Sequence, residues 1–292
     1  MGNGYSNWPE SNWASNTVDI GKASKIRAGV DIGTTSAQAA VFADDELCAW
    51  ANIRTGSDFR KAADTVRALT LDALSIDVKD VEAVTATGFG AKNVSYATGV
   101  MDEISCHAKG ARFMFGPTAM TVVDLGGQST HAIRLFDWDR VRAFQTNDKC
   151  ATGMGRHIEV VSELLGVPIT EIGDRSLGEG KDPEPVSTTC YNFAYPETIG
   201  LLRQGYKEDV YSERDVLAAY LFAVSWRIMS TIGKIAPLDI GDIVLEQDVA
   251  FTGGLAKNSG IVKRLERELK IETIKSKYDP QLAGAIGAAL LS

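Results

Sequence analysis

The hydrophobic and polar positions of this chain form a pattern that occurs twice. From Ile26 the segment IRAGVDIGTTSAQAAVFADDELCAWANIRT alternates short apolar runs with glycine or acidic turns, which predicts three strands joined by tight turns. From Thr121 the segment TVVDLGGQSTHAIRLFDWDRVRAFQTN repeats this order. Residues 30–42 and 123–135 align without a gap, and helical segments follow each set of strands. We therefore expect two duplicated α/β domains with a cleft between them.

The same pattern predicts the remaining elements. Apolar periodicity predicts helices over residues 60–76, 153–165 and 212–235, and small apolar residues predict a last helix at the C-terminus. VEAVTATGFG is expected to be a buried strand ending in glycines. Trp8 and Trp13 lie in a stretch without periodicity, which indicates either an arm that docks to a partner or a poorly ordered terminus.

The repeat also predicts where the domains begin and end. We expect an N-terminal arm over residues 1–25 and a first domain over residues 26–117 together with 279–292. The second domain is expected to span residues 118–278.

Composition narrows the class of partner. The 292 residues include 30 Lys and Arg against 38 Asp and Glu, which gives a formal net charge of −8. An acidic chain is a poor partner for nucleic acid or for a membrane surface, because both are polyanions. No apolar stretch approaches the roughly 18 residues of a membrane-spanning helix, and the start of the chain lacks the apolar core of a signal peptide. The four cysteines are scattered, which argues against a disulfide framework and for a cytoplasmic protein.

In both copies of the repeat an aspartate ends an apolar strand, and glycine and small polar residues follow at once. Such a turn points its amides at an anion, and glycine allows a phosphate to approach closely. Asp31 and Asp124 are expected to face each other across the cleft as the catalytic carboxylates and to hold Mg²⁺, in part through water. Two β-hairpins without a ligand are the alternative. The phosphate-binding residues that we expect are Gly33, Thr34, Thr35 and Ser36 in the first copy and Gly126, Gly127 and Gln128 in the second.

A third glycine loop, TGGLAKN at residues 252–258, precedes a predicted helix. It is expected to hold adenosine, so ATP or ADP would be the ligand. The chain contains neither a Walker A sequence nor G-x-G-x-x-G, so the P-loop and dinucleotide-binding classes are disfavoured. The residues that we expect to bind the nucleotide here are Gly253, Gly254, Lys257 and Asn258.

These three motifs resemble those of a known superfamily. DIGTTS and DLGGQS resemble the two phosphate motifs, and TGGLAKNSG the adenosine motif, of the actin, sugar-kinase and heat-shock-chaperone ATPases. The similarity runs from about residue 28 to the C-terminus. It implies an actin-like ATPase fold, in which two ribonuclease-H-like domains close on Mg-ATP in an interdomain cleft.

The cysteine segments narrow the resemblance. NDKCATGMGR, STTC and CHAKGA are similar to segments of the activator ATPases of 2-hydroxyacyl-CoA dehydratases and of their relatives, the ATP-binding subunits of benzoyl-CoA reductases. The resemblance implies that Cys150 and Cys190 are metal ligands, each just ahead of a helix whose N-terminus stabilises a thiolate. A [4Fe–4S] cluster generally needs four thiolates, so two related subunits would share one cluster. Zinc is the weaker alternative, since the chain has no C-x-x-C and only three histidines.

The resemblance further implies ATP-driven electron transfer. A ferredoxin-like donor would reduce the shared cluster, and the electron would pass to separate catalytic iron–sulfur subunits that bind an acyl-CoA. Ser129, His157 and Pro196 depart from the family pattern, and Pro196 is expected to kink or delay the helix after Cys190. These departures favour a subunit that works beside a related, non-identical ATPase subunit in a benzoyl-CoA reductase-type complex, an oxidoreductase of anaerobic aromatic degradation.

Three alternatives stay open. A homodimeric activator of a 2-hydroxyacyl-CoA dehydratase would share the fold, cluster and nucleotide. A small-molecule kinase of the same superfamily could use Asp124 beside an acceptor hydroxyl, but it would leave both cysteines unexplained. A non-enzymatic module that senses nucleotide would bind ATP without turnover.

Overall fold

The computed structural model describes residues 7–136, 140–149, 152–178, 182–208, 210–235, 238–239, 242–243 and 249–292. The chain divides into two compact units. The N-terminal unit comprises Pro9–Val122, Leu135–Arg142 and Ile274–Ser292. The C-terminal unit comprises Val123–Arg134 and Ala143–Thr273, together with Trp8.

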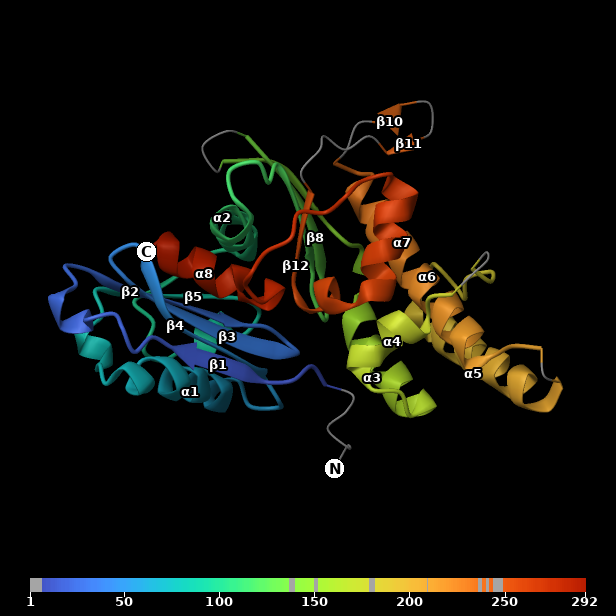
Figure 1. Ribbon diagram of the computed structural model, residues 1–292, viewed down its shortest axis with the longest axis horizontal. Helices are drawn as coiled ribbons and strands as arrows, with labels where there is room; N and C mark the ends of the chain where they lie inside the picture. The colour runs from blue at the N-terminus through green and yellow to red at the C-terminus, as the bar shows by residue number, and fades with distance from the viewer. Residues whose placement is uncertain are drawn as a thin grey trace. The chain divides into compact units, whose positions relative to one another are not determined.

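The N-terminal unit is built on a six-stranded sheet in the order β1-β4-β3-β2-β5-β6 (Figure 1). The central strand β2 is antiparallel to β3 and parallel to β5, so an antiparallel meander is joined to a parallel extension. Its strands are β1 (Ser11–Ala14), β2 (Ile26–Ile32), β3 (Ser36–Ala43), β4 (Glu46–Arg54), β5 (Ala83–Thr87) and β6 (Gly99–Val100). Its helices are α1 (Phe59–Thr70), α2 (Glu103–Phe115) and α8 (Ala283–Leu290).

Helices cover both faces of this sheet. Successive residues of β3 point to opposite faces and are apolar on both, so both faces are buried. Val41 belongs to the core that includes Val66 of α1. Its neighbour Phe42 points to the opposite face, into the core that includes Ile286 of α8. The helix α8 lies in the last segment, Ile274–Ser292, so the end of the chain returns to the N-terminal unit (Figure 1).

Glycines allow α2 and α8 to approach each other closely. A Cβ atom at Gly110 of α2 would overlap the carbonyl of Ala283, and one at Gly287 of α8 would overlap the carbonyl of Cys106. The small-residue sequence AGAIGAAL of α8 is therefore explained by backbone-to-backbone packing rather than by an exposed surface.

The C-terminal unit carries most of a four-stranded sheet in the order β12-β7-β8-β9. Its strands are β7 (Thr121–Leu125), β8 (Thr130–Leu135), β9 (Val141–Thr146) and β12 (Val249–Thr252), with a separate hairpin of β10 (Leu238–Asp239) and β11 (Asp242–Ile243). The helices are α3 (Met154–Leu165), α4 (Ile169–Arg175), α5 (Tyr191–Glu208), α6 (Glu213–Ile232) and α7 (Ser259–Leu269). The repeated meander of three strands that the sequence predicts is thus present in both sheets.

The helix α6 is the centre of the C-terminal core. Ser212 caps its first turn by accepting from the amide of Asp215, whose carboxylate accepts from the amide of Ser212 in return. The helix is long and apolar enough to cross a membrane by length and composition, but 78% of the relevant window is buried inside the protein. The apolar character of α6 is therefore that of a core helix.

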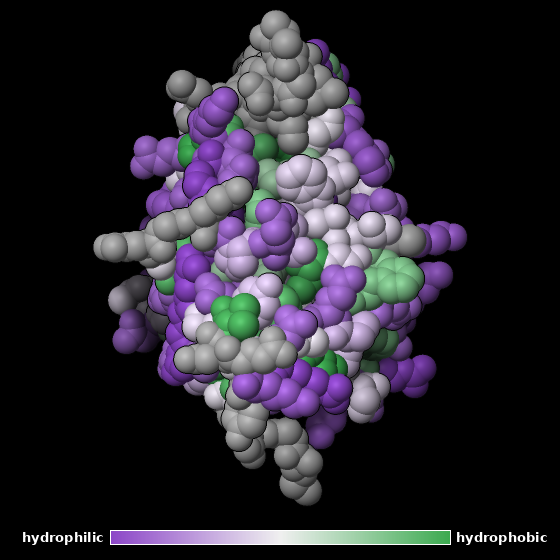
Figure 2. Space-filling model, turned by 90° about the vertical axis from the view of Figure 1, so that its right-hand side faces the viewer, coloured by the Kyte–Doolittle hydropathy of each residue, from purple (hydrophilic) through white to green (hydrophobic). Residues whose placement is uncertain are grey.

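On the face that Figure 2 shows, apolar side chains form small separate groups among polar ones.

Three elements differ from the sequence-based expectation. The arm contains a strand, β1, which pairs antiparallel with the edge strand β4. A short helix, α4, occupies residues that had no predicted element. The helix α5 begins at Tyr191 with Pro196 inside it, so the predicted delay after Cys190 is wrong. The proline costs one backbone hydrogen bond near the helix start, which the rest of the 18-residue helix tolerates.

Candidate functional site

The two glycine hairpins have the same backbone geometry. In the N-terminal unit the amide of Gly33 donates to the carbonyl of Ser36 at 3.0 Å. In the C-terminal unit the amide of Gly126 donates to the carbonyl of Ser129 at 2.9 Å. This closes a tight turn between β2 and β3, and again between β7 and β8, as the repeat predicts. The remaining hairpin residues, which are half-buried or exposed, are Thr34, Thr35, Gly127 and Gln128.

The aspartates at the ends of β2 and β7 are buried. Asp31 is 7% exposed and Asp124 is 4% exposed. Nε2 of His107, on α2, lies 3.9 Å from Oδ2 of Asp31, and the hydroxyl of Thr252 donates to Oδ1 of Asp124 at 3.2 Å. Each carboxylate therefore has a polar side chain of its own unit close to it.

Gly253 places the third glycine loop directly against Asp124. Its φ is +81°, a backbone conformation that favours glycine. A Cβ atom there would lie 2.6 Å from Oδ1 of Asp124 and 2.6 Å from the carbonyl oxygen of Leu125. The third glycine loop and the second aspartate are thus in contact within the C-terminal unit, and only glycine permits the contact.

Gly88 is the counterpart of Gly253 in the N-terminal unit, and sequence analysis missed its role. Its φ is +84°, and a Cβ atom there would overlap Oδ1 of Asp31 and lie 2.7 Å from the carbonyl oxygen of Ile32. The signal was available, since TGFGAKN at 87–93 matches TGGLAKN at 252–258 at five of seven positions. The two loops also share two backbone hydrogen bonds. In the first loop the amides of Ala91 and Asn93 donate to the carbonyls of Gly88 and Gly90. In the second loop the amides of Ala256 and Asn258 donate to the carbonyls of Gly253 and Leu255.

The end of the third glycine loop, residues 252–258, offers a buried donor. Lys257 is the last residue of the short helix η8 (Gly254–Lys257), and Asn258 follows as the N-cap of α7, accepting from the amide of Ile261 at 3.0 Å. Asn258 is 1% exposed, and its Nδ2 has no hydrogen-bond acceptor within the described residues. A buried donor without an acceptor is costly, so this amide suits a ligand that brings one.

Hydrogen bonds between backbone groups join the second hairpin to the start of α3. The amide of Gly153 donates to the carbonyl of Gln128, and the amide of Arg156 donates to the carbonyl of Gly127, both at 2.8 Å. A Cβ atom at Gly155 would lie 2.7 Å from the Cα of Gly127. Any movement of this hairpin must therefore move the first turn of α3, because no flexible side chain lies between them.

The first turn of α5 presents Cys190. The carbonyl of Cys190 accepts from the amides of Phe193 at 3.1 Å and of Ala194 at 3.0 Å, so Cys190 stands at the N-cap position, as expected. Its side chain is partly exposed. Cys150, the other expected ligand, lies outside the described residues, four positions before α3 begins at Met154.

The starts of α3 and α5 contact each other. The ring of His157, in α3, packs against the ring of Tyr191, the residue after Cys190. Burial lowers the pKa of His157 to about 4, and the positive charges of Arg227 and Arg156 act in the same direction. The imidazole is therefore neutral near pH 7, and the contact is one between two uncharged rings.

Arg227 of α6 holds the segment that leads into Cys190. Its Nε donates to the carbonyl of Thr188 at 2.9 Å, and its Nη2 donates to the carbonyl of Ser187. Burial lowers the pKa of this guanidinium from its ordinary value, but the group stays charged near neutral pH. Two side-chain hydrogen bonds from the core helix α6 therefore fix the backbone just before Cys190.

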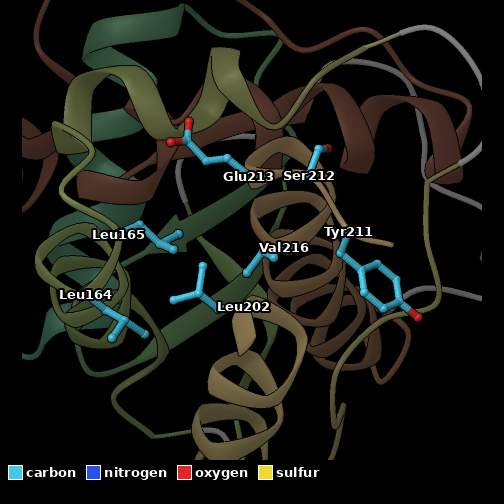
Figure 3. Close-up of a pocket in the computed structure, with 7 residues that line it drawn as sticks. All are labelled: Leu164, Leu165, Leu202, Tyr211, Ser212, Glu213 and Val216. Carbon is cyan, nitrogen blue, oxygen red and sulfur yellow. The ribbon is translucent and has the colours of Figure 1, made fainter. Parts of the chain in front are cut away.

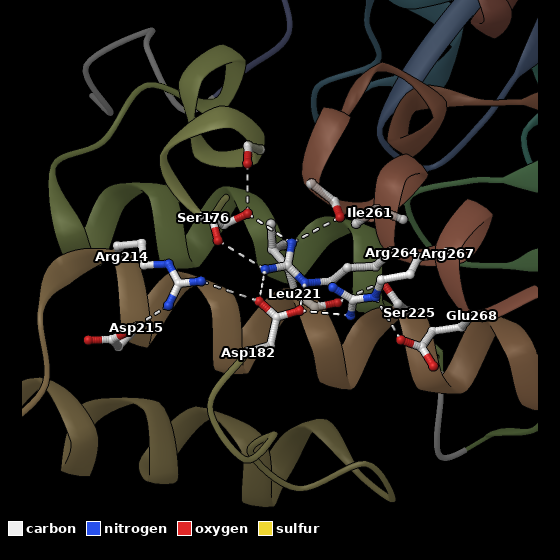
Figure 4. A network of polar contacts seen from close by, with 12 residues as sticks. Ser176, Asp182, Arg214, Asp215, Leu221, Ser225, Ile261, Arg264, Arg267 and Glu268 are labelled. Atoms are coloured by element: carbon white, nitrogen blue, oxygen red, sulfur yellow. Dashed lines mark hydrogen bonds and ion pairs between the residues drawn. The ribbon is translucent and has the colours of Figure 1, made fainter. Parts of the chain in front are cut away.

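The same segment is anchored at its other end by Asp182 (Figure 4). The carboxylate of Asp182 accepts from Nη2 of Arg264 at 2.8 Å and of Arg267 at 2.9 Å, and Arg214 lies 3.7 Å away. Burial alone would raise the pKa of Asp182, but the hydrogen bonds and charges of Arg264 and Arg267 hold it below its usual value. The segment from Asp182 to Cys190 is thus fixed at both ends.

The other two described cysteines have a different environment. Cys48 and Cys106 are fully buried. Burial raises the pKa of both thiols, in Cys106 to about 12. Both have the environment of small hydrophobic core residues. Within the part of the chain that the structure describes, no three His, Cys, Asp or Glu side chains form a metal-binding group.

A pocket of about 240 Å³ lies away from these motifs (Figure 3). It lies where the end of α3, the middle of α5 and the start of α6 meet, and its lining is mainly leucine and valine. None of the residues expected to bind nucleotide lines it, so it is not the nucleotide site. The lining residues are Leu164, Leu165, Leu202, Tyr211, Ser212, Glu213 and Val216.

Two related sheets, each with an aspartate, a glycine hairpin and a TG loop, define the actin-like ATPase fold. Comparison with known proteins agrees with this class. The chain is similar to the solved activator of the 2-hydroxyisocaproyl-CoA dehydratase from Clostridium difficile with bound ADPNP, with a TM-score of 0.75 and 30% identity over 91% of this chain and 93% of that one.

Two further relatives support a narrower assignment. The activator of lactoyl-CoA dehydratase from Anaerotignum propionicum is 34% identical over 90% of this chain and 95% of its own length. A benzoyl-CoA reductase subunit from Thauera aromatica is 29% identical over 91% of this chain and 92% of its own length. The BadF/BadG/BcrA/BcrD ATPase family matches residues 28–292, so the chain belongs to that family. Its members in this comparison are activators of acyl-CoA dehydratases and a benzoyl-CoA reductase subunit, and the expected family is confirmed.

Proposed function

We propose that this chain is the ATP-hydrolysing, electron-activating subunit of a cytoplasmic enzyme system that acts on an acyl-CoA. The backbone connection between a phosphate hairpin and the helices beside the cysteines carries the proposal. Gly127 and Gln128 are bonded to the first turn of α3, and α3 contacts the residue that follows Cys190. A nucleotide at the hairpin and a redox group at Cys190 would therefore be mechanically linked.

The nucleotide would be held by the three glycine segments. Asp31 and Asp124 would bind Mg²⁺ from the two units, in part through water, because Mg²⁺ gives up its hydration shell reluctantly. The hairpin amides would bind the phosphates, and loop 252–258 would bind adenosine, with Nδ2 of Asn258 donating to it. The family and the ADPNP-bound neighbour support nucleotide binding. Closure of both units on Mg-ATP is part of the proposal.

Cys190 fits one ligand position of an iron–sulfur cluster. It is partly exposed and stands at the start of an 18-residue helix, and Arg227 binds the backbone two and three residues before it. Cys150 would be the second ligand, and a related subunit would supply the other two. A [4Fe–4S] cluster held in this way supplies one-electron transfer at a low potential.

The protein's own part is to change the surroundings of those cysteines. Hydrolysis at the hairpin would shift Gly127 and Gln128, and the bonded amides of α3 would follow. The start of α5 would move with α3 through His157 and Tyr191. Exposure and hydrogen bonding around the cysteine sulfurs set the potential of such a site, so the movement would be felt there.

The acceptor would be a separate acyl-CoA-binding iron–sulfur component, and a ferredoxin-like donor would supply the electrons. Ser129, in place of an acid, and the N-terminal arm support a benzoyl-CoA reductase-type complex with a non-identical ATPase subunit. Sequence identity does not favour it, since the lactoyl-CoA dehydratase activator is 34% identical and the reductase subunit 29%. A homodimeric dehydratase activator is therefore an equal candidate for the acceptor system.

Anaerobic purification from the native host tests the proposal. We expect about four iron and four sulfide per two ATPase chains, and ATP turnover that differs between the reduced and oxidised protein. A non-identical ATPase chain and two catalytic chains in the same complex would identify the reductase type, and a homodimer the activator type. Absence of iron together with equal turnover in both redox states would refute the proposal. Nucleotide binding without iron or turnover would indicate a sensing module instead.

A further inference from the structure

The N-terminal arm, residues 7–25, lies outside the family match at 28–292 yet is built into the structure. Its strand β1 pairs with β4 from Ser11, opposite Asn52, to Ala14, opposite Ala49. The carboxylate of Glu10 accepts from the amide of Arg54 at 2.9 Å, which extends this attachment by one residue. From Glu10 onward the arm is therefore an edge strand of the N-terminal unit.

Trp8, the residue before Pro9, belongs to the C-terminal unit. Trp8 is half-buried and packs against the apolar core of the C-terminal unit. The ammonium group of Lys257 lies over its indole ring, 5.4 Å from the ring centre. This is a cation–π distance, and tryptophan is the aromatic residue that favours it most.

The position of Lys257 makes this contact relevant to function. Lys257 closes the helix η8 inside the loop TGGLAKN, next to the buried Asn258. Trp8, which lies outside the residues that match the family, thus contacts Lys257 in the loop proposed to bind adenosine. Trp13 provides the contrast, since it lies opposite Trp50 in the β1–β4 pair and is 44% exposed.

The spacing between the two attachments is short. Trp8 is fixed in the C-terminal unit and Glu10 in the N-terminal unit, and only Pro9 separates them. Proline fixes its own φ and restricts the residue before it, so this connection has little slack. Through the contact between Trp8 and Lys257, order in loop 252–258 and order at the start of the arm therefore stabilise each other.

We propose that Trp8 is a positioning residue for the nucleotide site, which orders Lys257 for adenosine nucleotides and couples the adenosine loop to the arm. The proposal rests on nucleotide binding at loop 252–258. Since coupling between two binding events is reciprocal, a bound adenosine nucleotide must also stabilise the docked arm. The arm would then be an addition by which this chain tightens a site that lies within the family region.

Calorimetric titration with Mg-ADP tests the proposal on the full chain. Trp8→Ala is expected to weaken binding about five-fold, the size of one partly exposed cation–π contact, while Trp8→Phe restores most of the affinity. Trp13→Ala, in the same arm, is the matched control and is expected to bind like the wild type. Tryptophan emission offers a second readout, since Mg-ADP is expected to change the emission of the wild type and of Trp13→Phe more than that of Trp8→Phe.

The two levels of proposal can fail separately. If the wild type does not bind Mg-ADP at all, the proposed nucleotide function fails. If the wild type binds but Trp8→Ala binds equally well, and the emission change is the same in Trp8→Phe, the role of Trp8 is refuted. A five-fold loss that Trp8→Phe does not restore would also refute it, because the cation–π contact would then not be the cause.

Discussion

Replacing Gly253 by alanine is expected to weaken Mg-ADP binding by about 100-fold, by analogy with the loss of reaction rate that a misplacement of about 1 Å causes at an active site. The new Cβ atom would lie 2.6 Å from Oδ1 of Asp124 and from the carbonyl of Leu125. Neither neighbour is the end of a flexible chain that can swing away. The carboxylate and the loop must therefore separate, which disrupts two parts of the proposed nucleotide site at once.

Gly116→Ala is the matched control for backbone strain. Gly116 has φ 90° and ψ 178°, and Gly253 has φ 81° and ψ 174°, so the conformational cost of alanine is nearly the same. A Cβ atom at Gly116 meets nothing within 4 Å. Backbone strain is expected to cost both variants about 1–3 kcal/mol of unfolding free energy in urea, and the clash at Gly253 adds to the loss in Gly253→Ala. Only Gly253→Ala should lose Mg-ADP binding in calorimetry. Equal affinity of the two variants would contradict the role of Gly253.

Replacing Cys190 by alanine is expected to remove the iron from the anaerobically purified protein. A cluster shared between two chains loses two of its four thiolates when both chains carry the substitution, and two thiolates do not hold it. We expect at least about a ten-fold fall in iron and sulfide per chain, measured by chemical analysis. Mg-ADP affinity is expected to stay within about two-fold, because Cys190 lies outside the glycine segments.

Cys48→Ala is the matched control for this experiment. Its side chain is fully buried and burial raises its pKa, so it has the environment of a core residue. It is expected to keep its iron while losing some stability, because the substitution leaves a small cavity. Full iron content in Cys190→Ala, or equal loss in both variants, would contradict the assignment of Cys190 as a ligand.

Short-range sequence signals predicted the parts of the site that depend on local geometry. The D-G turns after β2 and β7 follow from glycine and strand periodicity, and the structure gives both hairpins the same closing hydrogen bond. The position of Cys190 at the start of α5 was predicted as well. Such features need only neighbouring residues, so the sequence contains them directly.

Features that depend on distant partners were missed. The strand β1 has the polar sequence SNWA, and backbone pairing with an edge strand, which needs no hydrophobic pattern, holds it in place. The clamp on Asp182 joins arginines from α6 and α7 to a loop, so it exists only in the folded chain. Gly88 is an exception, because its signal, the match of TGFGAKN at 87–93 to TGGLAKN at 252–258, is local.

The central claim is that a nucleotide at the glycine segments alters the helix starts beside the cysteines. Hydrogen exchange with and without Mg-ADP tests it most directly. We expect altered protection in peptides that cover the first turns of α3 and α5, and a smaller response at α5 in Gly155→Ala, whose Cβ would lie 2.7 Å from the Cα of Gly127. Gly200→Ala, a helical glycine with nothing within 4 Å, should respond like the wild type. Changes confined to the glycine hairpins and loop 252–258 would contradict the account.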